Sequence, residues 1–167
     1  GTAAVIDIGA TTTNIVISTG GVPQFVRIIP AGGDDLTRAL ISRLGIDREL
    51  AERVKAGIGL ANGSVPPENR AAVEVIYEVT RELLNSLRNT LSYFANTREG
   101  RHVEQVVLSG GAARLPGFAE SLASMTSIKV TMADPFAKVE LGKEARHLAG
   151  SPARAAVALG LVLGRAA

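Results

Sequence analysis

The first thirty residues show short apolar runs separated by turns. Residues 3–8 (AAVIDI) and 13–18 (TNIVIS) flank a glycine-containing turn, and a second turn at 20–21 leads into residues 22–29 (VPQFVRII). Short apolar or alternating runs bounded by turn residues are typical of β-strands. Because the connections are so short, the three predicted strands should pair antiparallel.

The apolar spacing then changes to a helical period. Leu36, Leu40 and Leu44 share one face of a short helix, which Asp34 or Asp35 is expected to cap. Residues 47–57 predict a second short, charged helix. The longest helix is expected to begin at residue 67 and end near residue 96, with an apolar stripe at Ile76, Val79, Leu83, Leu87, Leu91 and Phe94.

The remainder of the chain alternates strands and helices. Strands are predicted near 103–108 and 128–132, with a helix at 115–125 between them and a last helix at 151–167. Three strands followed by helix, strand, helix, strand and helix indicate an α/β fold with a mixed sheet. We expect one domain over 1–167, with a small helical excursion at 34–66.

Composition excludes several classes of protein. Apolar residues make up 46% of the chain and charged residues 20%, which is typical of a globular protein. A formal net charge of +2 and an aromatic content of 4% argue against nucleic acid as a partner. The absence of cysteine excludes disulfides and thiolate metal sites. The longest apolar stretch, 155–164, is half of the roughly 20 residues that a membrane-spanning helix needs.

The stretch DIGATTT offers a candidate site for an anion or a metal. A carboxylate at the end of a buried strand, here Asp7, can hold a hydrated Mg²⁺ or orient water. Gly9 allows close approach of a ligand, and the hydroxyls of Thr11, Thr12 and Thr13 are potential phosphate donors. The alternative is a capped hairpin turn in which Asp7 only accepts backbone hydrogen bonds.

Two weaker signals lie elsewhere. Gly110, Gly111 and Ala112 follow an apolar strand and leave room for a flat ring or a sugar, although a simple turn explains them equally well. Glu52 and Lys55 are three residues apart on one helix face, which is also the pattern of an ordinary exposed salt bridge.

Taken together, the order and spacing of these motifs resemble the actin-like ATPase superfamily. DIGATTTNIVI, AGGDDLT, RELLNSLRNTLSYF, LSGGAARLPGFAESL and the DPF at 134–136 are similar to PilM-like proteins of type IV pilus assembly, which are related to FtsA. The resemblance covers nearly the whole chain. It implies an RNase H-like mixed sheet flanked by helices, forming the second lobe of an actin-like ATPase fold.

The resemblance also implies a nucleotide site. Asp7 would face Mg²⁺ through water, while Gly9, Thr11 and Thr12 would hold the phosphates of ATP, beside Thr13. Glu52 and Lys55 would bracket the ribose and adenine. The floor under the adenosine would comprise Gly110, Gly111 and Ala112. Gly32 and Gly33 would permit close approach of the nucleotide beside its phosphates.

The first phosphate hairpin of the superfamily has no counterpart in the sequence, so we expect half of a two-lobed cleft from a longer protein. For this chain the resemblance favours a non-enzymatic lobe, with weak ATPase activity only in the longer protein. It implies a cytoplasmic scaffold, peripheral to the inner membrane, that binds a PilN-like cytoplasmic tail. The alternatives are a sugar or small-molecule kinase lobe and a polymerising FtsA-like division protein.

The expected helix at 151–167 is apolar almost all round. Surface helices keep a polar face, so this helix should be covered by other protein. Because the first lobe is not part of the sequence, we expect the chain to self-associate through this helix.

Overall fold

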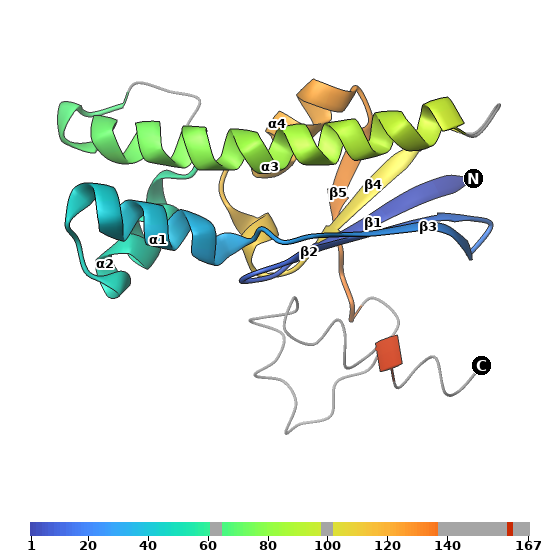
Figure 1. The fold of residues 1–167 in the computed structure, drawn as a ribbon, viewed down its shortest axis with the longest axis horizontal. Coiled ribbons are helices and arrows are strands. Elements are labelled where there is room, and N and C mark those ends of the chain that lie inside the picture. The colour runs from blue at the N-terminus through green and yellow to red at the C-terminus, as the bar shows by residue number, and fades with distance from the viewer. Residues whose placement is uncertain (61–64, 98–101, 137–159, 162–167) are drawn as a thin grey trace.

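The computed structural model describes residues 1–60, 65–97, 102–136 and 160–161. Within these residues the chain forms a sheet of strand order β3-β2-β1-β4-β5 (Figure 1). The strands are β1 (Thr2–Ile8), β2 (Thr13–Thr19), β3 (Val22–Ile29), β4 (Gln105–Ser109) and β5 (Lys129–Met132).

The pairing of the strands confirms the predicted mixed sheet. β1, β2 and β3 pair antiparallel, whereas β4 is parallel to both β1 and β5. The helical connections allow the parallel pairs, because a parallel crossover needs a long connection that a two-residue turn cannot supply. The predicted strand boundaries agree with the observed ones to within two residues or fewer.

The helices lie where the apolar spacing placed them. α3 and α4 cover one face of the sheet, while α1 and α2 extend beyond one end of it and α1 packs on α3 (Figure 1). The α-helices are α1 (Gly33–Leu44), α2 (Arg48–Ile58), α3 (Arg70–Thr97) and α4 (Phe118–Thr126), and the short 3₁₀ turns are η1 (Pro67–Asn69) and η2 (Ala112–Arg114).

The predicted cap of the first helix is wrong. Gly32, rather than Asp34 or Asp35, occupies the N-cap position of α1, and the Asp35 carboxylate accepts a hydrogen bond from the Gly32 N–H at 2.8 Å. The helix starts earlier because the N–H groups of Gly33 and Asp34 already have acceptors in the β1–β2 turn. Asp35 therefore stabilises the start of the helix from its third position.

The core lies between the sheet and α3. Alternate residues of β1, β2 and β4 are fully buried toward the helices, and Phe94 of α3 packs edge-on against Phe25 of β3. Full burial of each large apolar side chain contributes roughly 1.5–3 kcal/mol. The strand residues that supply this layer are Ala4, Ile6, Ile8, Ile15, Ile17, Val106 and Leu108.

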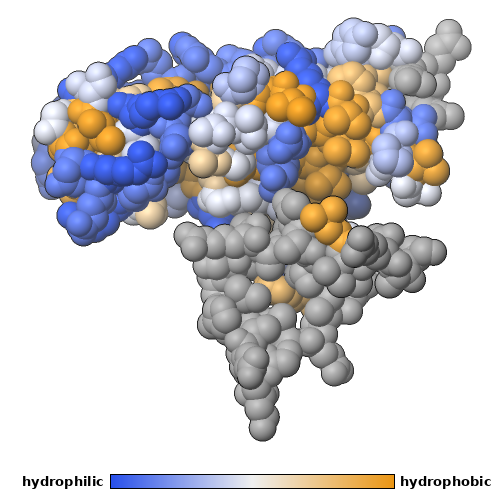
Figure 2. All heavy atoms as spheres, turned by 60° about the horizontal axis from the view of Figure 1, so that its bottom comes forward, coloured by the Kyte–Doolittle hydropathy of each residue, from blue (hydrophilic) through white to orange (hydrophobic). Residues whose placement is uncertain are grey.

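The opposite face of the sheet carries exposed apolar side chains. Val5, Val16 and Val26 are aligned across three strands, and Val5, Val26 and Ile28 are 41%, 62% and 64% exposed. Figure 2 brings this side forward and shows apolar side chains gathered there. The predicted helix at 151–167 lies outside the described residues except for Gly160 and Leu161, which are helical. Among the described residues, no helix is long and apolar enough to cross a membrane.

Candidate functional site

The turn between β1 and β2 is closed by its own backbone. The Gly9 N–H donates to the Thr12 carbonyl oxygen at 2.9 Å. Thr11 and Thr12 are exposed, whereas Thr13 is buried and its hydroxyl donates to the Ala31 carbonyl oxygen at 2.8 Å. The Thr13 hydroxyl is therefore engaged within the protein, whereas Thr11 and Thr12 lie on the surface of the turn.

Asp7 is half-buried near the end of β1, immediately before this turn. It pairs in register with Asn14 on β2 and Ser109 on β4, so the three side chains lie side by side on the sheet face opposite α3. Among the described residues, no group of three or more His, Cys, Asp or Glu side chains could hold a metal ion. A cation at Asp7 would therefore keep most of its water ligands, as Mg²⁺ commonly does.

The start of α1 is bonded directly to the turn. The Gly33 N–H donates to the Gly9 carbonyl oxygen at 2.9 Å, and the Asp34 N–H donates to the Ala10 carbonyl oxygen at 2.7 Å. A Cβ atom on Gly32 would lie 2.6 Å from both carbonyl oxygens, closer than real Cβ contacts allow. Glycine at position 32 therefore lets the helix and the turn pack as one unit.

A pocket of about 550 Å³ opens beside the first turn of α1. Ile8, which precedes the turn, contributes to its wall, so the pocket and the β1–β2 turn are neighbours. Six of the residues predicted from sequence line it: Gly32, Gly33, Glu52, Lys55, Gly111 and Ala112. Asp7, Gly9, Gly110 and the three threonines of the turn are not part of its lining.

Gly110 and Gly111 have different structural requirements. Gly110 has φ +90°, and a Cβ there would overlap the backbone of Ile8, so this glycine allows β4 to turn closely over β1. Gly111 is exposed, and a Cβ at this position would extend into open space.

A Cβ on Gly33 would come within 2.9 Å of the Ala112 Cβ. Gly33 and Ala112 thus pack closely against each other in the pocket lining, and a larger residue at position 33 would not fit without a shift.

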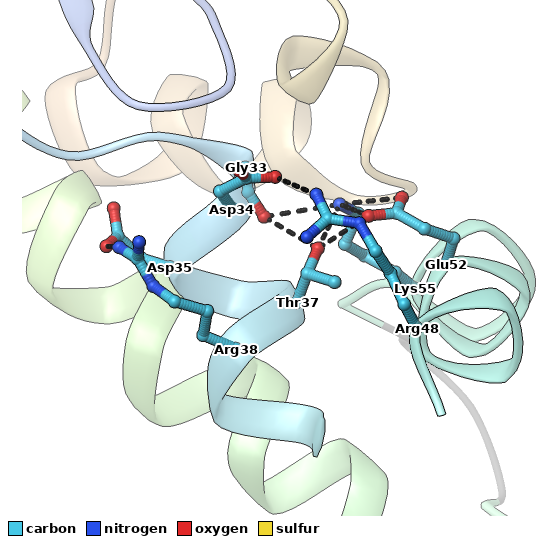
Figure 3. A network of polar contacts seen from close by, with 8 residues as sticks. All are labelled: Gly33, Asp34, Asp35, Thr37, Arg38, Arg48, Glu52 and Lys55. Carbon is cyan, nitrogen blue, oxygen red and sulfur yellow. Dashed lines mark hydrogen bonds and ion pairs between the residues drawn. The ribbon is translucent and has the colours of Figure 1, made fainter. Parts of the chain in front are cut away.

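Lys55 lies at the centre of a polar network between α1 and α2 (Figure 3). Its ammonium group donates to the Gly33 carbonyl oxygen at 3.2 Å, to the Thr37 hydroxyl at 2.8 Å and to the Glu52 Oε1 at 3.0 Å. Thr37 also donates to the Glu52 Oε1 at 2.6 Å. The side chains of Lys55 and Glu52 are 17% and 45% exposed, so this ion pair is not the ordinary exposed pair that the sequence also allowed.

The Glu52 carboxyl has a pKa below its ordinary value. Burial by itself raises this pKa, but the hydrogen bonds from Thr37 and Lys55 and the positive charges of Lys55 and Arg48 outweigh it. Arg48 is held near the network by an ion pair with Asp34 at 2.8 Å. The Glu52 carboxylate is therefore ionised at neutral pH and remains partly open to the pocket.

Thr37 is the principal residue that sequence reasoning missed. Its side chain is fully buried and joins the two residues that were predicted. Thr37 lies four residues after Gly33, and a threonine one helical turn inside a glycine-rich helix start could have drawn attention to it. Other polar side chains that line the pocket without having been predicted are Asp35, Thr80, Glu82, Ser86 and Arg114.

Comparisons with known sequences match this chain to pilus assembly and cell division proteins. A family model described as type IV pilus assembly protein PilM matches residues 1–166. The cell division protein FtsA of Streptococcus pneumoniae is 30% identical over 149 residues, which cover 80% of this chain and 32% of the relative. FtsA of Borreliella burgdorferi is 25% identical over 175 residues, which cover 95% of this chain and 41% of the relative.

Solved structures give the same grouping. A chain of the PilM-PilN type IV pilus biogenesis complex superposes with a TM-score of 0.80 at 28% identity, covering 97% of this chain and 45% of its own. MreB 5 of Spiroplasma citri bound to AMPPNP has a TM-score of 0.61 at 16% identity, and the match covers 99% of this chain and 53% of MreB 5. This match shows the shared fold. The chain thus spans about a third to a half of these relatives. Because the family model matches almost every residue, the chain belongs to the PilM family of type IV pilus assembly proteins and has the fold of an actin-like ATPase lobe.

Proposed function

We propose that this chain is the ATP-binding lobe of a cytoplasmic scaffold protein in type IV pilus assembly, with nucleotide acting as a conformational ligand. The proposal rests on one observation: the pocket beside α1 directly adjoins the β1–β2 turn. Gly33 lines the pocket and its N–H is bonded to Gly9 of the turn, so a ligand in the pocket would border the candidate phosphate site directly.

The residues present fit a Mg²⁺-nucleotide by their chemistry. Thr11 and Thr12 are exposed residues whose hydroxyls can donate to phosphate oxygens, and the carboxylate of the half-buried Asp7 suits a hydrated Mg²⁺. The pocket volume is in the range that small-molecule sites use. Within it, Gly111 and Ala112 would form the floor under the adenosine, and Glu52 would face the ribose.

The proposed partner follows from the relative and not from a surface of this chain. The solved relative is a chain of a PilM-PilN type IV pilus biogenesis complex, and this chain covers 45% of the matched chain. We propose a PilN-like tail as the partner of the longer protein and a location at the inner membrane through that partner. A polymerising role, as the FtsA matches suggest, is the second candidate function.

The chain by itself should bind Mg²⁺-ATP weakly and hydrolyse none detectably. Catalysis of phosphoryl transfer rests on positioning and charge from both sides of the phosphates, and this lobe supplies one side. Titration of the ¹⁵N-labelled chain with Mg²⁺-ATP should shift the amide signals of Gly9, Gly33, Glu52 and Gly111. The Asp7→Ala variant should reduce these shifts at equal ligand concentration, whereas Glu120→Ala, a carboxylate on α4 away from the pocket, should not.

Two results would count against the proposal. Shifts confined to residues away from the turn and the pocket would place any nucleotide elsewhere. Rapid ATP turnover by the chain alone would contradict the view that this lobe is half of a site.

A further inference from the structure

The hydrogen-bonding capacity of Lys55 is already used within the protein. An ammonium group has three donors. In this structure they are directed at the Gly33 carbonyl oxygen, the Thr37 hydroxyl and the carboxylate of Glu52, all within 3.2 Å. A ligand in the pocket could accept a hydrogen bond from Lys55 only by displacing one of these partners.

The carboxylate of Glu52, in contrast, does not use all of its hydrogen-bonding capacity within the protein. Its Oε1 accepts from Thr37 and Lys55, and its Oε2 lies 2.9 Å from the Lys55 ammonium group. An ionised carboxylate has about four lone-pair sites, so acceptor capacity remains. Because 45% of the Glu52 side chain is exposed and the residue lines the pocket, that capacity is available to a ligand that donates hydrogen bonds.

The Thr37 hydroxyl forms hydrogen bonds with both Lys55 and Glu52. This hydroxyl has one proton, which goes to the Glu52 carboxylate at 2.6 Å in preference to the Gly33 carbonyl oxygen at 3.1 Å, since a charged acceptor binds more strongly. The same oxygen accepts from Lys55. Figure 3 shows the Thr37 side chain pointing from α1 toward Glu52 and Lys55 of α2.

We infer that Thr37 is a positioning residue of the nucleotide site. It holds Lys55 in an internal role and orients Glu52 as the acceptor for the hydroxyl groups of a ribose. This inference rests on the proposed function. It gives the wall formed by Glu52 a preference for hydroxyl donors, and therefore for a ribonucleotide over a deoxyribonucleotide.

A purely structural role for Thr37 makes a different prediction. A threonine inside a helix often bonds the carbonyl four residues earlier, and Thr37 does lie within 3.1 Å of the Gly33 carbonyl oxygen. If that bond were its whole contribution, removal of the hydroxyl would change the stability of α1 without changing how the pocket distinguishes one sugar from another.

The test compares ATP with 2′,3′-dideoxy-ATP in the wild-type chain and in Thr37→Val, which removes the hydroxyl at nearly constant shape. Thr37→Ser retains the hydroxyl and is the matched control. Affinities come from NMR titration with Mg²⁺ present. Thr37→Ala serves as a second deletion if valine disturbs the packing, and urea midpoints verify that each variant is folded.

The wild-type chain and Thr37→Ser should bind ATP about tenfold more tightly than the dideoxy compound, the effect of losing hydrogen bonds to a charged group. Thr37→Val should lose most of this difference. The pKa of Glu52, followed by ¹³C NMR without nucleotide, should rise in Thr37→Val and remain low in Thr37→Ser.

Three results would overturn the inference. The first is unchanged sugar discrimination in folded Thr37→Val, and the second is equal affinity of the wild-type chain for both nucleotides. In either case the proposed nucleotide function would stand. The third, a wild-type chain that binds neither nucleotide, would overturn the proposed function as well.

Discussion

The backbone N–H of Asp34 lies 2.7 Å from the carbonyl oxygen of Ala10, so the first turn of α1 is bonded to the tip of the β1–β2 turn. The first N–H groups of a helix normally lack partners within it. Here the β1–β2 turn supplies two of those partners, and Asp35 satisfies the N–H of the cap residue Gly32. A displacement of the turn would therefore act directly on α1 and on the polar network behind it.

The close packing at Gly32 gives the first prediction. Gly32→Ala should destabilise the chain by about 2 kcal/mol or more, because its Cβ would lie 2.6 Å from two carbonyl oxygens and would separate α1 from the turn. Gly57→Ala is the control, since Gly57 lies in α2 and an added Cβ there would extend into open space. Alanine at 57 should be neutral or stabilising. Urea denaturation of both variants checks the contrast, and equal midpoints would contradict it.

The two glycines after β4 give a second contrast. Gly110→Ala should cost more than about 2 kcal/mol, because φ is +90° and the new Cβ would overlap the backbone of Ile8. Gly111→Ala should leave the free energy of unfolding nearly unchanged, since the added methyl group would meet open space. Thermal or urea unfolding would measure this. A large loss at Gly111 would mean that its environment differs from the one described.

The lowered pKa of Glu52 predicts a dependence of stability on pH. A carboxyl with a lower pKa in the folded state contributes stability above its ordinary pKa, and that stability is lost as the pH falls through the folded-state pKa. The Glu52→Gln variant should therefore be less stable than the wild-type chain near neutral pH. The difference between the two should shrink as the pH falls below the ordinary pKa of a glutamate carboxyl.

Denaturant unfolding at a series of pH values measures that difference. Glu120→Gln, in the first turn of α4, is the control for the general effect of removing a carboxylate. A gap between Glu52→Gln and the wild-type chain that stays constant as the pH falls well below the ordinary pKa of a glutamate carboxyl would show that the Glu52 carboxylate does not supply the stability.

Self-association is the fourth prediction. Val5, Val26 and Ile28 leave apolar surface on the sheet face opposite α3, and the sequence at 151–167 offers an apolar segment with few polar positions. At roughly 25 cal/mol per Å², coverage of such surfaces can contribute several kcal/mol to association. Sedimentation of the chain should detect a dimer, and a version truncated after Gly150 should be monomeric. Two equally monomeric species would contradict the prediction.

Much of the fold could be read from the chain because its patterns are local. Short connections force residues 3–29 into an antiparallel meander. Most of the apolar stripe predicted for residues 76–94 is buried, whereas Val79 and Leu83 are partly exposed and line the pocket. The order of the elements predicted a mixed sheet, whereas the parallel pairing of β4 with β1 was decided by the tertiary structure. The cap of α1 could not be read in this way, because the acceptors that allow Gly32 to start the helix come from Gly9 and Ala10, more than twenty residues earlier.

For the candidate site, the residue types and their order, together with the family resemblance, led to the prediction of twelve residues. Only the tertiary structure decided what each of them contacts within the protein. It buries the Thr13 hydroxyl against Ala31, packs Gly110 on Ile8 and directs every donor of Lys55 into the protein. It also adds Thr37, which lies on a different helix from Glu52 and Lys55. The physical reason is that a hydrogen bond depends on distance and direction between groups far apart in the chain, and a linear pattern specifies neither.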